Sequence, residues 1–309
     1  MIRFSIIVPY LEPSNAFDGT LASVLRYRPS SSEVIVVHDG TYHDPYRLKP
    51  EVRLVAAQRD SLAGNRFFEM LTAGVRHCES DFSVWMRPGV ELDEGWEHSV
   101  VDAFGDQQVA SVSPLIVARH RSQQVVCAGV ETDGRGTRQL SGVGAKVATL
   151  AVSSLEPMGP SSWLGAWRTG LLNSVLPVTA NVADIYLDAE IAFIMRELGY
   201  ASQINPGFVG YVDDADVILD QSKLAHGDCA QRGFEKFLKS NSGNSLAANM
   251  VRDLAQAAIS PWRFKHAVQR LTSVKWRHVD QAQIDQLFHV DGDGVVEEFE
   301  SKKVLARAA

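Results

Sequence analysis

Short apolar runs alternate with amphipathic segments along the first part of the chain. Four apolar runs stand at residues 3–9, 33–37, 52–56 and 82–86. Runs of this length, bounded by proline, glycine or polar residues, are typical of strands buried on both faces. Residues 18–28 and 62–77 carry apolar side chains at helical spacing, with Asp18 as a candidate N-cap. The alternation predicts an α/β fold with a mostly parallel sheet flanked by helices.

The pattern continues less regularly and then changes character. Residues 109–118 form another strand-like run, residues 129–144 a glycine-rich hairpin, and residues 182–198 an amphipathic helix. From about residue 221 onward, helical patterns are interrupted near residues 240–244 and at Pro261, and strand signals are few. We therefore expect an α/β domain in residues 1–218 and a helical C-terminal extension in residues 219–309.

Composition and charge narrow the function classes. A net charge of −7 over 309 residues argues against a broad surface for nucleic acid or anionic membrane. Three widely spaced cysteines argue against a disulfide framework or a zinc site and fit a reducing, cytoplasmic setting. No apolar run approaches the roughly 18 residues that a membrane-spanning segment needs. The oligomeric state is not indicated.

Polar or turn-forming residues follow three of the predicted strands. They are Pro9-Tyr10, His38-Asp39-Gly40 and Arg87-Pro88-Gly89. Ligands of parallel α/β sheets bind beyond the carboxyl ends of the strands, so these three ends predict one crevice.

An ordered set of segments resembles the family 2 inverting glycosyltransferases, which have a Rossmann-like GT-A fold. The segments are Phe4–Pro9, Leu21–Leu25, Val34–Gly40, Leu71–Val75, Phe82–Leu92, Asp184–Ile191 and Leu198–Tyr200. The resemblance covers about residues 3–213. It implies transfer of a hexosyl group, with inversion, from a nucleotide-diphosphate-sugar donor to a hydroxyl of a glycan or other acceptor, as in polysaccharide biosynthesis.

The resemblance places the nucleotide at the first strand ends. The family has an acid, usually one of two aspartates, where Asp39 stands, and His38 replaces the first. Asp39 could accept hydrogen bonds from a base edge, or it could simply cap the strand in an Asp-Gly turn. Pro9, Tyr10 and Glu12 would flank the nucleotide.

Residues near the third strand's exit are further candidates. Arg59, Asn65 and Arg66 could reach ribose or phosphate, and surface or helix-start roles are equally open.

The segment Trp85–Leu92 departs from the family pattern. Here the family usually presents two aspartates that hold a divalent metal on the diphosphate, and this chain has Arg87-Pro88-Gly89. Arginine has no lone pair for a metal but can pair bidentately with a diphosphate. Either Arg87 replaces the metal, so that no cofactor is required, or Arg87 is a solvated loop residue in a degenerate site.

Asp188 is the candidate catalytic base. In the helix of residues 182–198 it falls beside the apolar arc, while Glu190 is expected to face solvent. A carboxylate on an inward face needs a reason, and taking the proton of an acceptor hydroxyl is one. In the family an acidic pair stands here, and Leu187 replaces its first member. The alternative is a structural aspartate paired with an arginine.

Two weaker signals complete the candidates. Trp163 and Trp167 lie in a segment that often lines the acceptor side in the family, although large aromatics are more often core residues. Residues 289–300 resemble an EF-hand loop with Asp291, Asp293 and Glu300 at ligand positions, but histidine stands first and no second hand follows. We expect weak or absent calcium binding there.

A non-catalytic relative that binds a nucleotide, a glycan or a protein partner is the main alternative function. The missing aspartate pair and Leu187 favour it, and the inward Asp188 argues against it.

Overall fold

The computed structural model describes residues 3–57, 66–120, 124–132, 138–152, 155–179, 184, 187–213 and 218. The predicted extension of residues 219–309, with the calcium candidates Asp291, Asp293 and Glu300, lies outside the described residues. Arg59 and Asn65 also lie outside them.

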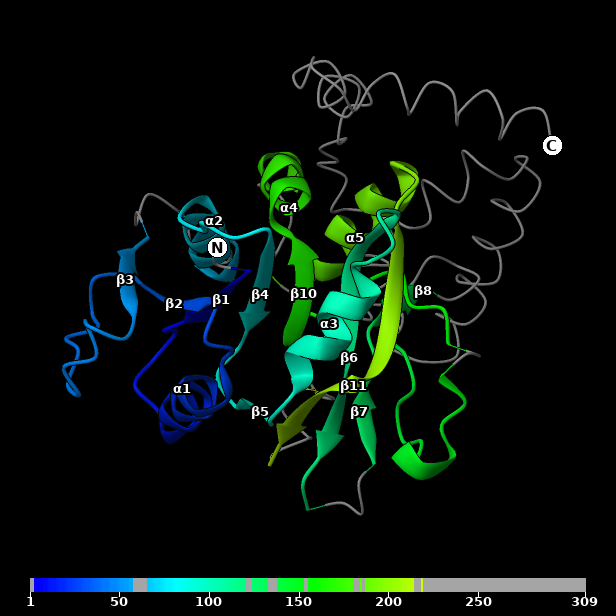
Figure 1. Ribbon diagram of the computed structural model, residues 1–309, viewed down its shortest axis with the longest axis horizontal. Coiled ribbons are helices and arrows are strands. Elements are labelled where there is room, and N and C mark those ends of the chain that lie inside the picture. Colours follow the sequence, from blue (N-terminus) through cyan, green and yellow to red (C-terminus); the bar gives the residue numbers. More distant parts are fainter. Residues whose placement is uncertain are drawn as a thin grey trace, which may run out of the picture.

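One large sheet runs through the described domain (Figure 1). Its strands are β1 (Phe4–Pro9), β2 (Ser32–His38), β3 (Arg53–Ala56), β4 (Phe82–Met86), β5 (Val90–Leu92), β6 (Val109–Ala118), β7 (Val125–Cys127), β10 (Leu164–Arg168) and β11 (Ala201–Val212). Their order is β3-β2-β1-β4-β10-β6-β11-β5, and β7 pairs with β6. A separate antiparallel pair is formed by β8 (Val130–Thr132) and β9 (Arg138–Leu140).

The predicted parallel half-sheet is confirmed. Strands β3, β2, β1 and β4 are neighbours in this order, and each neighbouring pair is parallel. Parallel neighbours need crossover connections rather than tight hairpins. Beyond β4 the sheet becomes mixed, since β10 is antiparallel to both β4 and β6. The carboxyl ends of β1, β2 and β4 therefore lie along one edge, as the sequence predicts.

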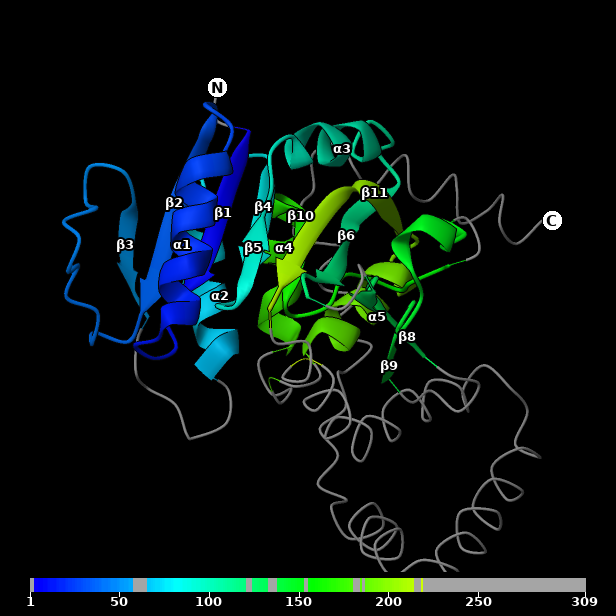
Figure 2. The same cartoon turned by 90° about the horizontal axis from the view of Figure 1, so that it is seen from below.

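Helices cover both faces of this sheet. They are α1 (Asn15–Tyr27), α2 (Arg66–Arg76), α3 (Trp96–Ala103), α4 (Thr169–Val175) and α5 (Leu187–Glu197), with short 3-10 turns η1 (Val147–Thr149) and η3 (Leu176–Thr179). Figures 1 and 2 show α1 and α2 on opposite sides of β1 and β2. One apolar core holds α1 and α3, and a second holds α2, α4 and α5. Among the described residues, no helix is both long and apolar enough to cross a bilayer.

The helix starts differ in part from the predicted ones. Helix α1 begins at Asn15 and is capped by the hydroxyl of Ser14, which accepts from the backbone N of Phe17 at 3.3 Å. The expectation that Asp18 is the cap was therefore wrong, and Asp18 instead accepts from the Tyr46 hydroxyl at 3.0 Å. The glycine-rich hairpin is confirmed as β8 and β9.

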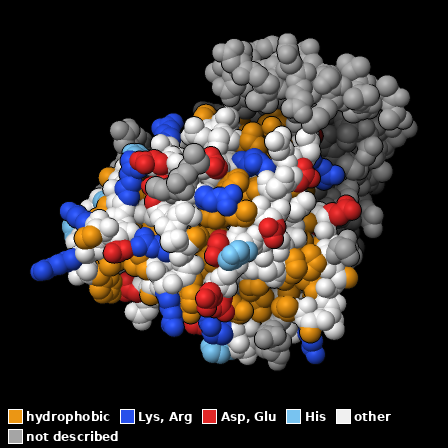
Figure 3. All heavy atoms as spheres, viewed as in Figure 1, with side chains coloured by type: hydrophobic (Ala, Val, Ile, Leu, Met, Phe, Trp, Pro, Cys, Tyr) orange, Lys and Arg blue, Asp and Glu red, His pale blue; other side chains and the backbone are white. Residues whose placement is uncertain are grey.

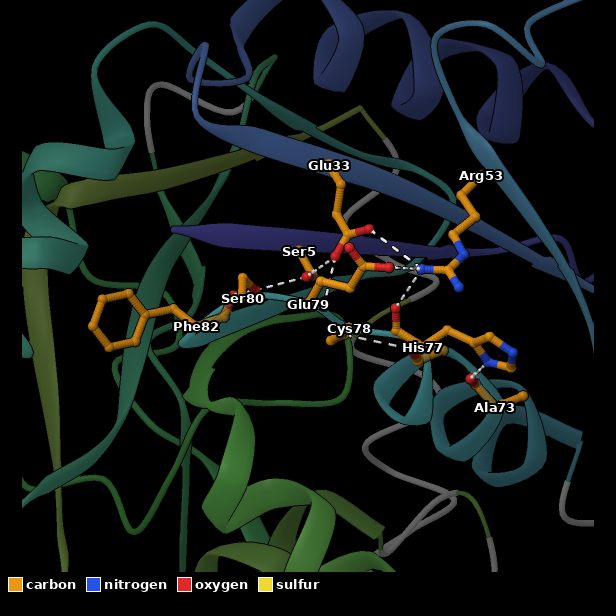
Figure 4. Close-up of polar contacts among 10 residues, drawn as sticks. Ser5, Glu33, Arg53, Ala73, His77, Cys78, Glu79, Ser80 and Phe82 are labelled. Carbon is orange, nitrogen blue, oxygen red and sulfur yellow. Dashed lines mark hydrogen bonds and ion pairs between the residues drawn. The ribbon is translucent and has the colours of Figure 1, made fainter. Parts of the chain in front are cut away.

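A polar cluster closes the opposite edge of the sheet, at the amino ends of the parallel strands (Figure 4). Arg53 forms an ion pair with Glu79 at 2.8 Å, and the carboxylate of Glu33 accepts from the backbone N of Glu79 at 2.8 Å. Burial raises the pKa of the Cys78 thiol in this cluster to about 12, so the thiol stays protonated at neutral pH. These contacts join β2, β3 and the turn before β4, away from the strand ends that face the predicted crevice.

Close packing between α5 and the chain before β10 gives a first testable prediction. A Cβ built on Gly159 would lie 2.5 Å from Cβ of Ala192 on α5. We therefore expect Gly159→Ala to lower the free energy of unfolding by about 1–3 kcal/mol, as overpacking does. Gly170→Ala is the matched control, because a Cβ there meets nothing within 4 Å. Urea denaturation measures both, and equal stability of the two variants would contradict the packing argument.

Candidate functional site

The turn after β2 brings Asp39 and Arg66 together. Oδ1 of Asp39 accepts from the backbone N of Thr41 at 3.2 Å and from its hydroxyl at 2.6 Å, while Oδ2 meets Nη2 of Arg66 at 2.7 Å. The side chain of Arg66 is 47% exposed and that of Asp39 is 15% exposed. Both predicted nucleotide-binding residues thus stand at the same strand end, and an exposed guanidinium is available there to a ligand.

The first turn of α2 joins this ion pair to the loop after β4. Arg66 begins α2 and contacts Asp39, and the next residue, Phe67, lies under the guanidinium of Arg87. The amino end of α2 therefore contacts the residues that follow β2 and the residues that follow β4.

The loop of Arg87, Pro88 and Gly89 is a tight turn into β5. Gly89 adopts a positive φ of 97°, a conformation that other residues rarely take, and its backbone N donates to the Thr20 hydroxyl of α1 at 2.9 Å. The backbone N of Arg87 donates to the carbonyl of Trp163 at 2.8 Å. The turn is anchored on both sides, so the position of Arg87 is fixed by the fold.

Two aromatic rings hold the guanidinium of Arg87. Its Cζ lies 4.1 Å from the ring centroid of Phe67 and 5.6 Å from that of Trp163. Burial lowers the pKa of Arg87, and the nearby carboxylates of Asp184 and Asp188 act in the opposite direction. Arg87 is half-buried, which does not match the solvated loop residue considered as one alternative.

Asp188 lies fully inside the protein and is paired with Arg138. Its helical phase was predicted correctly, since it is 0% exposed. Nε and Nη2 of Arg138 donate to its two oxygens at 2.9 and 2.7 Å, and the backbone N of Ser162 donates to Oδ2 at 2.7 Å. The arginine pair that the sequence left open as an alternative role is therefore present. The prediction that Glu190 faces solvent was wrong, because Glu190 is 9% exposed.

Asp184 caps helix α2 from another part of the chain. Its two oxygens accept from the backbone N of Phe67 at 2.8 Å and of Phe68 at 2.9 Å. Burial raises the pKa of Asp184, and the two backbone donors and Arg87 partly offset the effect. The carboxylate thus satisfies two of the amides that a helix start leaves open.

The residues at the exit of β1 are less accessible to a bound nucleotide. Pro9 ends the strand in a buried position, and Tyr10 is 8% exposed. The ring of Tyr10 packs edge-on against Phe17 at 4.9 Å and Tyr42 at 4.8 Å, measured between centroids. Glu12 is exposed just beyond them. Of these three candidates, Glu12 offers a solvent-facing side chain.

The two tryptophans occupy different places. Trp163 is 8% exposed and contributes a ring to the Arg87 site. Trp167 is 0% exposed and packs on Trp85 with centroids 5.2 Å apart, in the core between the sheet and α5. A ring buried on all sides has no face for a sugar, so the acceptor-side prediction for Trp167 does not fit this structure.

The residues at the β4 end do not fit a divalent metal. Arg87 offers no lone pair, and the two nearby carboxylates, Asp184 and Asp188, already accept from backbone amides and from Arg138. Within the part of the chain that the structure describes, no group of three or more histidine, cysteine, aspartate and glutamate side chains is placed to hold a metal ion.

Sequence reasoning missed Arg138 and the capping role of Asp184. Arg138 stands 50 residues before Asp188, and Asp184 lies 117 residues after Phe67. No local periodicity links such distant positions. Arg138 is one of four charged residues in the segment 129–144, so the sequence gives no signal that singles it out.

A pocket of about 420 Å³ lies elsewhere, between the carboxyl end of α5, the start of β11 and the chain before β10. Arg196, Tyr200 and Glu156 contribute polar groups to it, and none of the predicted site residues lines it. On the face shown in Figure 3, acidic and basic side chains are interspersed and do not gather into one patch.

No protein-family model matches this sequence, and no curated protein matches it significantly. Similarity appears at the level of structure. The structure of GalNAc-T7 with UDP, GalNAc and Mn²⁺ matches with a TM-score of 0.50 and 10% identity, over 68% of this chain and 43% of that one. The chain thus spans less than half the length of that protein.

Two further structures match less closely. The mannosyltransferase PcManGT from Pyrobaculum calidifontis, in complex with GDP-Man and Mn²⁺, gives a TM-score of 0.47 at 15% identity, over 88% of each chain. TarS from S. aureus gives 0.43 at 13% identity, over 72% of this chain and 39% of that one. The mixed sheet and the match to the GalNAc-T7 structure together show that the described domain has the α/β fold of the GT-A glycosyltransferases.

Proposed function

We propose that this protein is a glycosyltransferase. It transfers a hexosyl group, with inversion, from a nucleotide-diphosphate-sugar donor to a hydroxyl of a glycan or other acceptor. The GT-A fold supports the donor class, and the strand ends that carry Asp39, Arg66 and Arg87 are where such a fold binds ligands.

The observation that carries the proposal is the placement of Arg87. A positive group flanked by two aromatic rings stands at the end of β4. One of these rings belongs to Phe67, which directly follows Arg66, whose side chain is 47% exposed. The departing diphosphate gains negative charge as the glycosidic bond breaks, and a preorganised cation stabilises that charge. Arginine also matches two phosphate oxygens at once.

We propose further that the reaction needs no divalent metal. This rests on the chemistry of the side chains at the end of β4. A metal ion would need free oxygen ligands there, but the site offers an arginine and two carboxylates that already accept hydrogen bonds. Arg87 would bind the diphosphate directly, and Asp39 would accept from the nucleotide. Trp163, which flanks Arg87, would border the sugar.

Asp188 remains the proposed base. It would accept the proton of the acceptor hydroxyl as that oxygen attacks the anomeric carbon, and the bond to the diphosphate breaks with its electron pair leaving on the diphosphate. The alternative, a non-catalytic binding protein, retains support from Leu187 and from the burial of Asp188.

A donor panel followed by a transfer assay tests the proposal. We expect at least one of UDP-, GDP- or dTDP-sugars to raise the melting temperature and to be consumed by the wild type. Asp188→Asn should bind that donor and transfer about 10²–10⁴-fold more slowly, the usual contribution of a general base. If a nucleotide binds but wild type and Asp188→Asn are equally inert, the protein is a binding module.

A further inference from the structure

Both carboxylate oxygens of Asp188 are occupied by donors. Oδ1 accepts from Nε of Arg138 at 2.9 Å and from the backbone N of Ala189 at 2.7 Å. Oδ2 accepts from Nη2 of Arg138 and the backbone N of Ser162, each at 2.7 Å. The side chain of Asp188 is 0% exposed and that of Arg138 is 5% exposed. A base must offer a lone pair to the hydroxyl it deprotonates, so Asp188 can act only after Arg138 has moved away.

The charges around this pair indicate what could move Arg138. Arg87, in the loop after β4, and the thiol of Cys127, in β7, both interact electrostatically with the pair, and Asp184, in the chain before α5, interacts with Arg87. Arg87 and Arg138 repel one another, Asp184 and Asp188 attract Arg87, and Asp188 holds Arg138. An anion bound beside Arg87 would therefore also attract the guanidinium of Arg138.

The hairpin that carries Arg138 lies close to the site. Arg138 begins β9, which pairs with β8, and the backbone N of Val130 in β8 donates to the carbonyl of Gly159 at 2.8 Å. Three residues further along the chain from Pro160 is Trp163, which flanks Arg87. A guanidinium on this hairpin can exchange one anionic partner for another through rotation of its side-chain bonds, because arginine carries its charge on a rotatable methylene stem.

We propose that Arg138 is a second diphosphate-binding residue, for which Asp188 and the donor diphosphate compete. Without donor, Arg138 holds Asp188 as a closed ion pair. Bound donor takes the guanidinium, and the freed carboxylate can then accept the acceptor's proton. Arg138 stays protonated throughout, so the exchange is of ion pairs alone. The inference rests on the proposed function, and it makes the base available when the donor is in place.

Competition for one arginine predicts variants with opposite effects on nucleotide binding. Asp188→Asn removes the competing charge, so we expect UDP to bind about 5-fold tighter or more, a common size for coupling between two ligands. Arg138→Gln removes a charged donor, so we expect UDP to bind about 10-fold weaker or more, with UMP much less affected. Titration calorimetry in EDTA measures both, with GDP and GMP used instead if guanine donors bind.

Two further variants keep the test informative. Arg53→Gln removes an ion-paired arginine at the opposite edge of the sheet (Figure 4) and should leave UDP affinity unchanged. If Arg138→Gln does not fold, the double variant Arg138→Met, Asp188→Leu replaces the buried pair by apolar side chains, a change that proteins often tolerate. It should show the same loss of preference for UDP over UMP.

The outcomes separate the two proposals. If folded Asp188→Asn binds UDP no tighter than the wild type, or if Arg138→Gln keeps the wild-type ratio of UDP to UMP affinity, the competition is disproved while the proposed function stands. If the wild type binds none of these nucleotides, the proposed function fails and the inference fails with it.

Discussion

Arg87→Met is expected to lower kcat/KM for the nucleotide-sugar donor by about 10²–10³-fold, the loss seen when one preorganised group that stabilises transition-state charge is removed. The charge of Arg87 would be lost, but the fold should persist. The flexible thioether of methionine can pack between Phe67 and Trp163, where the guanidinium now lies 4.1 and 5.6 Å from the ring centroids. Initial rates at saturating acceptor, measured in EDTA, give the comparison.

Two companion variants show whether the loss comes from the charge at this place. Arg87→Lys keeps the charge without the planar fork, so its activity should fall between those of the wild type and Arg87→Met. Arg168 is the matched control, because its guanidinium also lies over two rings, those of Phe104 at 5.2 Å and Phe82 at 5.9 Å, outside the site. Arg168→Met should keep its kcat/KM. Wild-type kinetics in Arg87→Met would mean that Arg87 does not bind the donor.

Asp188→Ala is expected to lower the free energy of unfolding by about 3–5 kcal/mol, the cost of removing one partner from a buried ion pair. The variant would leave the guanidinium of Arg138, 5% exposed, without its bidentate carboxylate. It would also remove the acceptor of the Ser162 backbone amide. Urea denaturation at neutral pH measures the loss.

A second substitution should restore much of this stability. In Asp188→Ala, Arg138→Met the buried charge is gone as well, so we expect the double variant to be more stable than Asp188→Ala alone. If Asp188→Ala unfolds at the same urea concentration as the wild type, the pair contributes little and the description of a closed ion pair is wrong.

The parallel half of the fold could be predicted because its signals are local. Strands β1, β2 and β4 are continuous buried runs, and their periods and boundaries are visible in the sequence within a residue. The central strand β10 was not predicted, because Gly165 and Ala166 interrupt the run of large apolar side chains that marks β1, β2 and β4. Its antiparallel pairing with β4 and β6 depends on partners about 50–80 residues away, as the register of Gly165 with Trp85 and of Ala166 with Val112 shows.

The candidate site divides in the same way. Asp39, Arg66 and Arg87 could be placed from the sequence because each follows a strand or begins a helix at the same edge. The inward phase of Asp188 could also be predicted, since one residue in a helix fixes the direction of its neighbours. Its partner could not, because Arg138 reaches Asp188 through the packing of a hairpin on α5. Tertiary contacts of this kind decide whether a carboxylate is paired with a cation or free to accept a proton.

Donor turnover in EDTA tests the central claim most directly, namely that Arg87 takes the place of a metal ion. The wild type would be freed of metal, supplied with the donor that the panel selects and an acceptor, and assayed in EDTA and again with excess Mn²⁺. We predict the same rate in both conditions, and a large loss in EDTA when Arg87 is replaced by methionine. Turnover that EDTA abolishes and Mn²⁺ restores in the wild type would contradict this account.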